Sequence, residues 1–286
     1  MRKKFKVHIK GGRSIGGNVV LFLVLAGTGF FMLLPLIFIA GNAFKPIDEL
    51  FIFPPRLLAR HPGFDNFKSM FLIMSQSWVP FGRYIFNTVF LTAAGTAGHL
   101  LLASMAAFVL AKHNFPGRNI LFHMVVLSLM FTPAVTGVSN YIIMSKFHII
   151  DTYFASLLPA LQMTLGLYLM KQFMEGLPDS VLESARIDGA GEMTLYAKIA
   201  MPMVKPAWIT LVVLTAMALW SSSTPLVYSE ELKSMPQAMS QILAGGIIRT
   251  GASAAVALFM LIVPLVLFIF SQSRIIETMN SSGMKE

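Results

Sequence analysis

Six long segments of this sequence contain no Asp, Glu, Lys or Arg, and they limit the possible folds more than any other feature. The segments are residues 19–44, 84–111, 119–145, 152–170, 206–229 and 250–273. A helix needs about 20 residues to cross the hydrocarbon core of a bilayer. Backbone amides in lipid must be satisfied within the segment, so we expect helices. The sequence therefore predicts an all-α integral membrane protein with six transmembrane helices.

Charge supports this prediction and suggests an orientation. Only 12% of the residues are charged, whereas soluble domains have about 25%. The formal charge of +9 includes six basic residues within the first 13 positions, next to the first apolar segment. Such a cluster is typical of a membrane-orientation signal and not of a nucleic-acid site. With the N-terminus inside, 14 of the 22 basic residues lie inside, which agrees with the positive-inside rule.

These observations divide the chain into three parts. Residues 1–18 are predicted to form a cytoplasmic basic segment, residues 19–273 the membrane domain, and residues 274–286 a cytoplasmic tail. The first apolar segment is longer than the core of a cleaved signal peptide, so we expect it to be retained. The stretch 45–83 holds five prolines and predicts an irregular connection on the outer side.

The segment 175–206 must lie outside the hydrocarbon. Between Asp179 and Lys198 it contains six charged residues. Placing them at a bilayer centre would cost on the order of 15 kcal/mol. The segment joins the fourth and fifth apolar segments, on the predicted cytoplasmic side.

Local signals predict two short helices in this loop. Ser180 and Glu183 have the spacing of a capping box, and Gly189 lies where a helix end favours a left-handed residue. A second helix, 192–200, is expected to stop before Pro202. One face of the first helix combines small and apolar residues: Val181, Leu182, Ala185 and Gly189. From the residues alone, a helix that docks on a partner and an amphipathic helix on the bilayer surface are equally acceptable.

The same loop resembles the signature of inner-membrane permeases of binding-protein-dependent ABC importers. That signature is Glu-Ala-Ala, three residues, Gly, nine residues, then Ile-x-Leu-Pro. Here Glu183-Ser184-Ala185 is followed at the same spacing by Gly189, Ile199 and Pro202. Two positions differ, since Ser184 replaces Ala and Met201 replaces Leu. Both changes are small or conserve volume.

Other stretches are similar to the carbohydrate-uptake branch of that family, and the six-span maltose-permease subunit is the nearest type. They are residues 87–88, 106–112, 115–118, 172–173 and 205–207, and the phrase ESARIDGAG. The resemblance covers roughly residue 84 to the end and, more loosely, the first apolar segment. After Trp220 the family often has an Asn-Asp pair, whereas this chain has Ser221, Ser222, Ser223 and Thr224. This difference affects the details of the translocation path and not the fold.

The resemblance implies a type I ABC importer permease in a bacterial inner (cytoplasmic) membrane, with both termini cytoplasmic. It implies a heterodimer with a homologous permease, two ATPase subunits, an extracytoplasmic solute-binding protein, contact with membrane lipid, and a sugar or oligosaccharide as cargo. The first helix of the loop would be the coupling helix that docks on the ATPase. The implied docking residues are Glu183, Ser184, Ala185, Asp188, Gly189, Ile199 and Pro202. An amino acid or a glycerophosphate is the alternative cargo.

The sequence contains no G-x-x-x-x-G-K-[ST] phosphate-binding loop. We therefore expect no ATP hydrolysis, no catalytic residue, no metal site and no cofactor in this chain, with ATP and Mg held by the partner ATPase subunits. An integral membrane enzyme would need a spaced cluster of His, Asp or Glu, and none is evident. Cysteine is absent, which excludes thiol chemistry.

Uncharged polar residues within the apolar segments are candidates for the substrate path. Trp220, Ser221 and Ser222 could offer an aromatic surface and hydroxyls to a sugar, and Asn140 and Tyr141 are weaker candidates of the same kind. The alternative is an interfacial tryptophan with helix-capping hydroxyls.

His99 and His123 are the only ionisable residues inside the predicted spans apart from tyrosines. An ion-coupled secondary transporter would normally use several such groups, often carboxylates, so structural histidines are the favoured interpretation.

Overall fold

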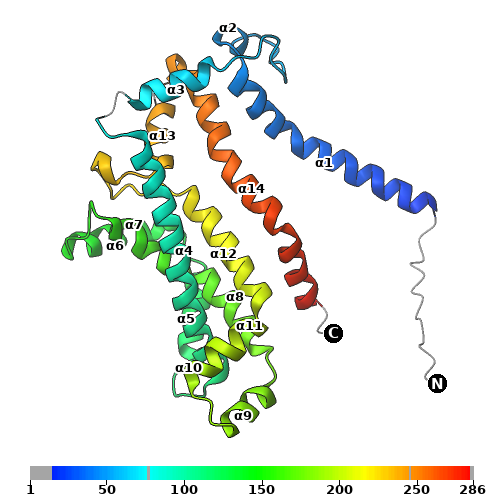
Figure 1. The fold of residues 1–286 in the computed structure, drawn as a ribbon, viewed down its shortest axis with the longest axis vertical. Helices are drawn as coiled ribbons and strands as arrows, with labels where there is room; N and C mark the ends of the chain where they lie inside the picture. Colours follow the sequence, from blue (N-terminus) through cyan, green and yellow to red (C-terminus); the bar gives the residue numbers. More distant parts are fainter. Residues whose placement is uncertain (1–14, 76–77, 245, 284–286) are drawn as a thin grey trace.

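The computed structural model describes residues 15–75, 78–244 and 246–283 (Figure 1). Within these ranges every element of regular structure is a helix, which confirms the all-α prediction. Residues 1–14, which make up most of the predicted basic segment, and residues 284–286 of the predicted tail lie outside the described residues.

The helices follow the apolar segments closely in some places and divide them in others. In chain order they are α1 (Ile15–Phe44), α2 (Ile47–Leu50), α3 (Asp65–Ser75), α4 (Phe81–Lys112), α5 (Arg118–Ser128), α6 (Pro133–Lys146), α7 (Tyr153–Leu161), α8 (Thr164–Glu175), α9 (Asp179–Ile187), α10 (Glu192–Thr194), the π-helical turn η1 (Leu195–Ala200), α11 (Met201–Met203), α12 (Lys205–Trp220), η2 (Glu230–Leu232), α13 (Met235–Leu243), η3 (Gly246–Arg249) and α14 (Thr250–Gly283).

Four of the six predicted spans correspond to helical segments that are long and apolar enough to cross a bilayer, and a fifth reaches that length only when α12, of 16 residues, is joined to residues 192–203 of the charged loop. The four are single segments: Gly16–Phe44, Phe81–Lys112, Tyr153–Glu175 and Thr250–Gln272. The fifth is a pair, Glu192–Met203 and Lys205–Trp220, which is bent by 82°. This fifth segment ends at Trp220 and not at residue 229 as predicted, because the Ser- and Pro-containing stretch after Trp220 does not continue the helix.

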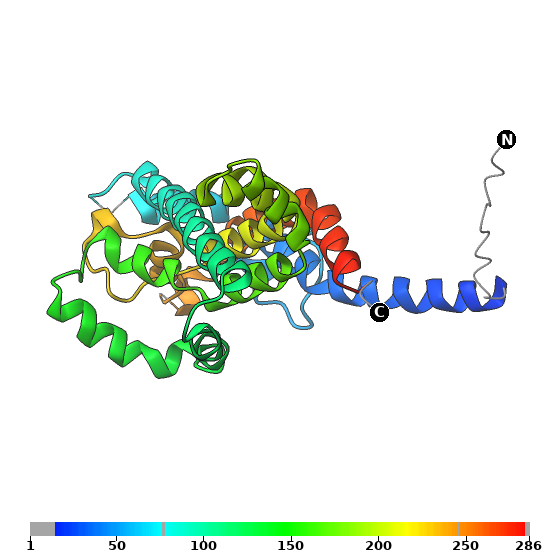
Figure 2. The same cartoon turned by 90° about the horizontal axis from the view of Figure 1, so that it is seen from below.

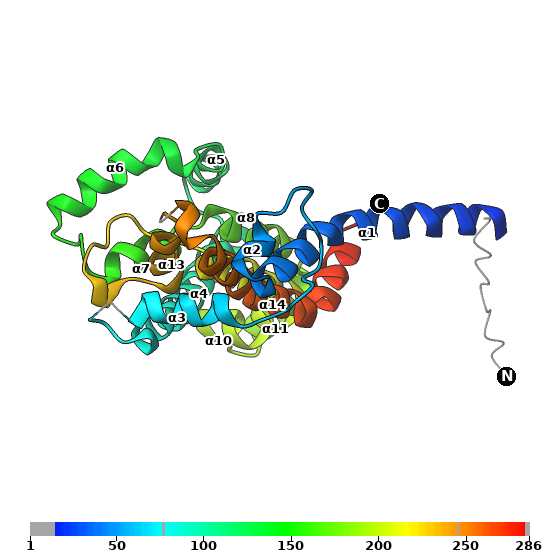
Figure 3. The same cartoon turned by 90° about the horizontal axis from the view of Figure 1, so that it is seen from above.

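The third predicted span, 119–145, is not one helix. It divides into α5 and α6, of 11 and 14 residues. Thr132 has an extended backbone before Pro133, which is the first residue of α6. Proline lacks a backbone N–H and disfavours a helical residue before it, so the helix breaks here. α5 and α6 lie at the edge of the bundle in Figure 3, and α5 packs on α8.

α4 is the central helix of the bundle. It packs against α7, α8 and α12, while α14 packs against α12, α3 and α1. Two buried clusters lie at opposite ends of α4. One, near Phe108, joins α4 to α8 and the 175–206 loop, and the other, near Tyr84, joins α4 to α3, α13 and α14. Residues 16–33 of α1 are exposed, and this part of α1 projects away from the bundle in Figure 2.

The outer stretch 45–83 is more ordered than predicted. It contains α2 and α3, and side chains hold its irregular part in place. The Glu49 carboxylate accepts hydrogen bonds from the backbone N–H groups of Arg60 (2.8 Å) and His61 (3.1 Å). The Asn66 amide donates to the backbone carbonyl of Lys45 at 2.7 Å.

Candidate docking loop and translocation path

Helix α9 opens the 175–206 loop and ends at a left-handed glycine. Gly189 has φ +84°. Its N–H donates to the Arg186 carbonyl at 3.0 Å, and the Ala190 N–H donates to the Ala185 carbonyl at 2.9 Å. This pair of bonds defines a Schellman motif, which satisfies carbonyls that a helix end would otherwise leave free. The predicted conformation of Gly189 is therefore confirmed.

The capping box predicted from Ser180 and Glu183 is wrong. α9 begins at Asp179, its N-cap is Pro178, and the cap makes no side-chain hydrogen bond. Ser180 thus lies inside the first turn, where its backbone carbonyl accepts a hydrogen bond from the Ser184 hydroxyl at 2.8 Å. The fixed φ of Pro178 defines the start of the helix instead.

The second helix does not stop before Pro202, which corrects that prediction. It runs from Glu192 through Pro202 to Met203, and residues Leu195–Ala200 form a π-helical turn. A π-turn is wider than an α-turn, so it relieves the clash between a proline ring and the preceding turn. The chain bends only at Val204, where α12 follows at 82°.

Buried side chains fix the base of the loop to the bundle. Leu182 of α9 and Leu195 and Ala200 of the second helix are at most 2% exposed, and they pack in the cluster that includes Phe108 and Met174. The Tyr196 hydroxyl lies 2.6 Å from the Ser104 hydroxyl of α4. These contacts join the loop directly to α4 and α8.

Ion pairs add a polar connection at the same end of α4. The Lys112 ammonium donates to the Asp179 carboxylate and to the Leu177 carbonyl, both at 2.6 Å, and the Lys112 side chain is 4% exposed. The hydrogen bond from Lys112, together with its charge, lowers the pKa of Asp179. The Glu192 carboxylate contacts Arg186 at 3.2 Å and the His113 ring at 3.0 Å. The hydrogen bond from Arg186 is the main cause of the lowered pKa of Glu192, against an opposing effect of burial.

The predicted docking residues fall into two groups. The exposed group comprises Glu183, Ser184, Asp188, Gly189 and Pro202. The first four lie in or directly after α9, which is the lowest helix in Figure 1, whereas Pro202 lies in α11 next to the bend before α12. Ala185 and Ile199 are partly buried and pack on the cluster around Phe108. The predicted small-residue face of α9 is therefore divided, because Ala185 and Leu182 face the bundle while Gly189 has open space around it.

Three exposed large apolar side chains in the loop were missed by the sequence analysis, and one of them, Met203, is 46% exposed next to the bend before α12. Ile187 is 86% exposed and Met193 is 64% exposed, one on each helix of the pair. The sequence could have indicated them, because large apolar residues are unusual in a segment with six charged residues that is predicted to lie in water. Ile187 and Met193 therefore add exposed apolar surface to a loop that is otherwise rich in charge.

The structure does not bring the candidate path residues together. Trp220 is 9% exposed at the end of α12. Ser222 lines a cavity of only about 20 Å³ with hydroxyl neighbours that include Thr88, Ser156 and Thr224. That space is too small for a sugar ring and suits one water molecule. Ser221 is exposed and lines none of the described cavities.

Asn140 and Tyr141 lie on α6, away from Trp220. Tyr141 is 46% exposed. Asn140 lines a groove of about 500 Å³ between the α5–α6 and α7–α8 pairs, hereafter the central groove. Its described lining residues are Ser128, Leu129, Phe131, Thr136, Asn140, Pro159, Gln162, Met163, Thr164 and Leu165. Of these, the sequence analysis singled out only Asn140.

The two histidines have different environments. His99 is 1% exposed on α4, and its Nδ1 lies 3.1 Å from the Leu161 carbonyl at the end of α7. Among the described residues its Nε2 has no hydrogen-bond partner. His123 is exposed on α5. In the described ranges there is no group of three or more His, Cys, Asp or Glu residues that could hold a metal.

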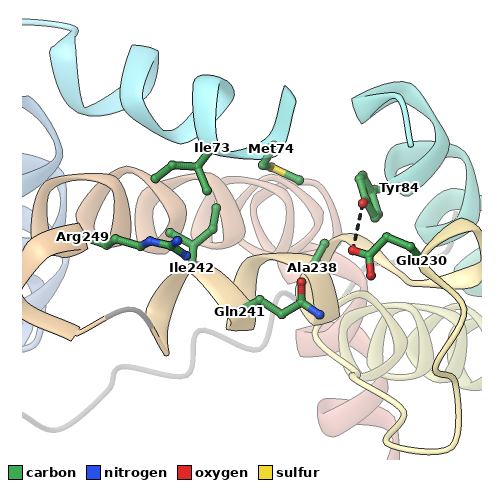
Figure 4. Close-up of a pocket in the computed structure, with 8 residues that line it drawn as sticks. All are labelled: Ile73, Met74, Tyr84, Glu230, Ala238, Gln241, Ile242 and Arg249. Atoms are coloured by element: carbon green, nitrogen blue, oxygen red, sulfur yellow. Dashed lines mark hydrogen bonds between the residues drawn. The ribbon is translucent and has the colours of Figure 1, made fainter. Parts of the chain in front are cut away.

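A second pocket, of about 240 Å³, lies between α3, α4 and α13, at the end of the bundle opposite the 175–206 loop (Figure 4). The Tyr84 hydroxyl donates to the Glu230 carboxylate at 3.0 Å, and Arg249 lies at the opposite end. Nearby, the buried Asn87 amide donates to the carbonyls of Glu231 (2.7 Å) and Lys233 (2.9 Å). These bonds hold the stretch after α12 on α4, which is a structural role.

An all-helical chain with several possible spans and a charged loop fixed to its central helices has the features of a membrane transport subunit. Residues 99–279 match the family model of the binding-protein-dependent transport system inner membrane component, and this chain belongs to that family. The family resemblance found at Glu183–Pro202 is thereby confirmed, and the chain is a multi-pass inner-membrane transport component.

Relatives and solved structures agree with this assignment. Protein LplC of Bacillus subtilis (strain 168) is 31% identical over 219 residues, which cover 75% of this chain and 70% of LplC. The arabinooligosaccharides transport system permease protein AraQ of Halalkalibacterium halodurans is 29% identical over 281 residues, 93% of this chain and 96% of AraQ. The crystal structure of a bacterial ABC transporter involved in the import of the acidic polysaccharide alginate has a TM-score of 0.75 at 20% identity, covering 91% of this chain and 98% of that chain. This likeness confirms the importer permease fold.

Proposed function

We propose that this chain is a membrane-spanning subunit of an ATP-driven importer that moves a sugar or oligosaccharide into the cytoplasm. Family membership supports the transport role, and full-length similarity to a permease named for arabinooligosaccharides supports the cargo class. An extracytoplasmic binding protein would deliver the sugar, and a homologous permease would complete the pathway. Both termini of this chain would lie in the cytoplasm.

The observation that carries the mechanism is the construction of the 175–206 loop. Its base is fixed to α4 and α8 by Leu182, Leu195 and the Lys112–Asp179 ion pair, while Ile187 and Met193 are exposed. In this proposal the exposed end docks on a separate ATPase subunit. ATP-driven closure of two such subunits would then move the loop, and α4 and α8 with it, as one body.

This chain would bind neither ATP nor Mg and would not hydrolyse ATP. In the proposal both ligands belong to the partner ATPase subunits, and the energy of hydrolysis reaches the membrane domain through the docked helices. Differential contacts of the loop with open and closed ATPase dimers would shift the membrane domain between its two orientations.

The test is purification of the tagged chain from its native membranes in mild detergent, followed by measurement of the subunit ratio and reconstitution into vesicles. We expect recovery with one homologous permease and two ATPase copies, with sugar uptake only when ATP and the binding protein are present. Recovery of the chain alone, or as a homo-oligomer that takes up solute without an ATPase, would contradict the proposal and favour an ion-coupled transporter.

A further inference from the structure

The central groove lies between two helix breaks at membrane depth. One break is residues 129–132, between α5 and α6, and the other is residues 162–163, between α7 and α8. The Ser128 hydroxyl donates to the Thr164 hydroxyl at 3.1 Å, so the two breaks are directly adjacent. The groove therefore opens where two neighbouring segments both lose helical structure.

The position of His99 gives the depth of the groove. His99 Nδ1 lies 3.1 Å from the Leu161 carbonyl, next to the second break. In α4 (Phe81–Lys112), His99 is about 27 Å from the outer end and about 20 Å from the inner end at the rise of an α-helix. The hydrocarbon core is about 30 Å thick, so the break lies close to its middle. Irregular backbone at that depth is stable only inside protein or beside a water-filled cavity.

The groove offers unused hydrogen-bonding groups beside an apolar surface. Within the described residues, the side-chain amides of Asn140 and Gln162 make no hydrogen bond. Each amide supplies two donors and one acceptor. Phe131, which is 60% exposed, and Leu165, which is 50% exposed, also line the groove. Amides next to an aromatic ring can bind both the hydroxyls and the apolar face of a saccharide ring.

The groove also lacks charge. None of its ten described lining residues is Asp, Glu, Lys, Arg or His. A carboxylate or phosphate held near the middle of the bilayer would need a partner such as arginine, because an unpaired charge there is costly. The N-termini of α6 and α8 have no side-chain cap, but their free amides can donate to a hydroxyl oxygen as well as to a carboxylate, so they do not discriminate.

We propose that the central groove is a sugar-binding subsite on the translocation path, and that it accepts uncharged saccharides and disfavours acidic ones. This inference rests on the proposed function, since it presumes a sugar importer. It assigns direct substrate contact to this subunit through Asn140 and Gln162, with Phe131 as the stacking surface. The outer binding protein selects the cargo first, and the groove adds a second selection inside the membrane.

The experiment uses the absence of native cysteine. Gln162→Cys and Asn140→Cys variants of this chain are assembled into the complete complex and labelled with a thiol reagent in detergent, without the binding protein. Trisaccharides of arabinose and glucose are the neutral probes, and trisaccharides of galacturonate and mannuronate are the acidic ones. Asn119→Cys, an exposed position near the start of α5, is the matched control. Uptake of the same probes, with the binding protein present, is measured in parallel for Asn140→Ala, Gln162→Ala and Asn119→Ala.

The proposal expects at least one neutral probe to slow labelling at residues 140 and 162, no acidic probe to do so, and no effect at residue 119. It also expects Asn140→Ala and Gln162→Ala each to raise the KM of neutral sugar uptake about fivefold to tenfold, as loss of one or two hydrogen bonds predicts, while Asn119→Ala is unchanged. Size-exclusion chromatography establishes that each variant assembles.

Three results would overturn it. If sugar uptake is normal but no probe protects either cysteine, the groove is not a sugar subsite. If acidic probes slow the labelling of the two cysteines as much as neutral probes do, the proposed preference for uncharged saccharides is wrong. If the assembled complex takes up no sugar at all, the proposed function itself fails and this inference fails with it.

Discussion

Gly189 is the residue of the loop with the strictest backbone requirement. Its φ of +84° is unfavourable for residues with a Cβ atom, but the space around a Cβ would be open. Gly189→Val should therefore act through backbone strain of about 1–2 kcal/mol and not through a clash. We expect the Schellman end of α9 to distort, with at least a tenfold loss of ATP-driven uptake and weaker co-purification of the ATPase.

Gly189→Asn is the matched control for that prediction. Asparagine tolerates the left-handed conformation better than other non-glycine residues, and nothing lies within 4 Å of its Cβ position. Uptake by this variant should stay within about twofold of wild type. Normal uptake by Gly189→Val, measured in the same vesicles, would show that this turn has no part in coupling.

The ion pair of Lys112 with Asp179 makes the anchoring of α9 dependent on pH. The pKa of Asp179 is lowered from its ordinary value of 3.8, so the stabilising contribution is complete above that pH and is lost as the pH falls through the lower folded-state value. We expect the hydrogen-exchange protection of α9 amides, corrected for intrinsic rates, to fall below about pH 4. Glu192 contributes in the same direction because its pKa is also lowered.

Asp179→Asn tests which group is responsible. The variant should lose α9 protection at neutral pH and show a weaker decrease on acidification, since Glu192 then remains of the two carboxylates whose pKa is lowered. Identical pH profiles for the variant and the wild type would mean that the contact between Lys112 and Asp179 does not hold α9.

At the scale of elements, α4 and α8 pack closely at Gly166. A Cβ there would lie 2.1 Å from His99 Nε2 and 2.7 Å from a Leu211 methyl group. Since His99 is buried and held by the Leu161 carbonyl, it cannot move away freely. Gly166→Ala should destabilise the complex by about 1–3 kcal/mol, seen as a lower midpoint of thermal unfolding.

Gly137→Ala in α6 is the control for this packing argument. No atom lies within 4 Å of its Cβ position, and alanine favours a helix over glycine by up to about 1 kcal/mol. The midpoint of thermal unfolding of the Gly137→Ala complex should be equal to or higher than that of the wild type. A Gly166→Ala complex as stable as Gly137→Ala would show that α4 and α8 are further apart than this structure has them.

The sequence predicted those elements whose cause is local. Uninterrupted apolar length predicts α1, α4 and α14, and Gly189 predicts the end of α9. The break before Pro133 also has a local cause. Proline is uncharged, however, so it does not interrupt a segment that is defined by the absence of charged residues. The start of α9 after Pro178 and the π-turn before Pro202 also have local causes, whereas the contact between Tyr196 and Ser104 joins segments 92 residues apart, so no short segment predicts it.

The two candidate sites also differ in whether a local sequence pattern predicts them. The proposed docking residues come from the spacing of a recognisable signature, which did not separate exposed Asp188 from partly buried Ile199. The central groove was not predictable, because Asn140 and Gln162 come from different predicted spans. Only the adjacent breaks near Ser128 and Thr164 bring those spans together.

At the scale of the whole molecule, much apolar surface is left exposed by the part of the chain that the structure describes. α1 is exposed over residues 16–33, and α6 presents Val135, Val138 and Ile143, each more than half exposed. Lipid can cover some of this surface, and in the proposed function a homologous permease covers the rest. Each end of the bundle has one strongly exposed side chain: Phe53 (91% exposed) follows the C-terminal end of α1, and Ile187 lies at the end of α9 in the 175–206 loop.

These two exposed positions allow a test of orientation in a chain that has no cysteine of its own. In right-side-out vesicles, a membrane-impermeant thiol reagent should label Phe53→Cys at once and Ile187→Cys only after permeabilisation. The cysteine-free parent measures background. After permeabilisation, Ile187→Cys should label at least tenfold more slowly in the assembled complex than in the chain stripped of its ATPase, because docking would bury the side chain. Immediate labelling of Ile187→Cys from outside would reverse the proposed topology, whereas equal labelling with and without the ATPase would keep the topology and remove Ile187 from the docking surface.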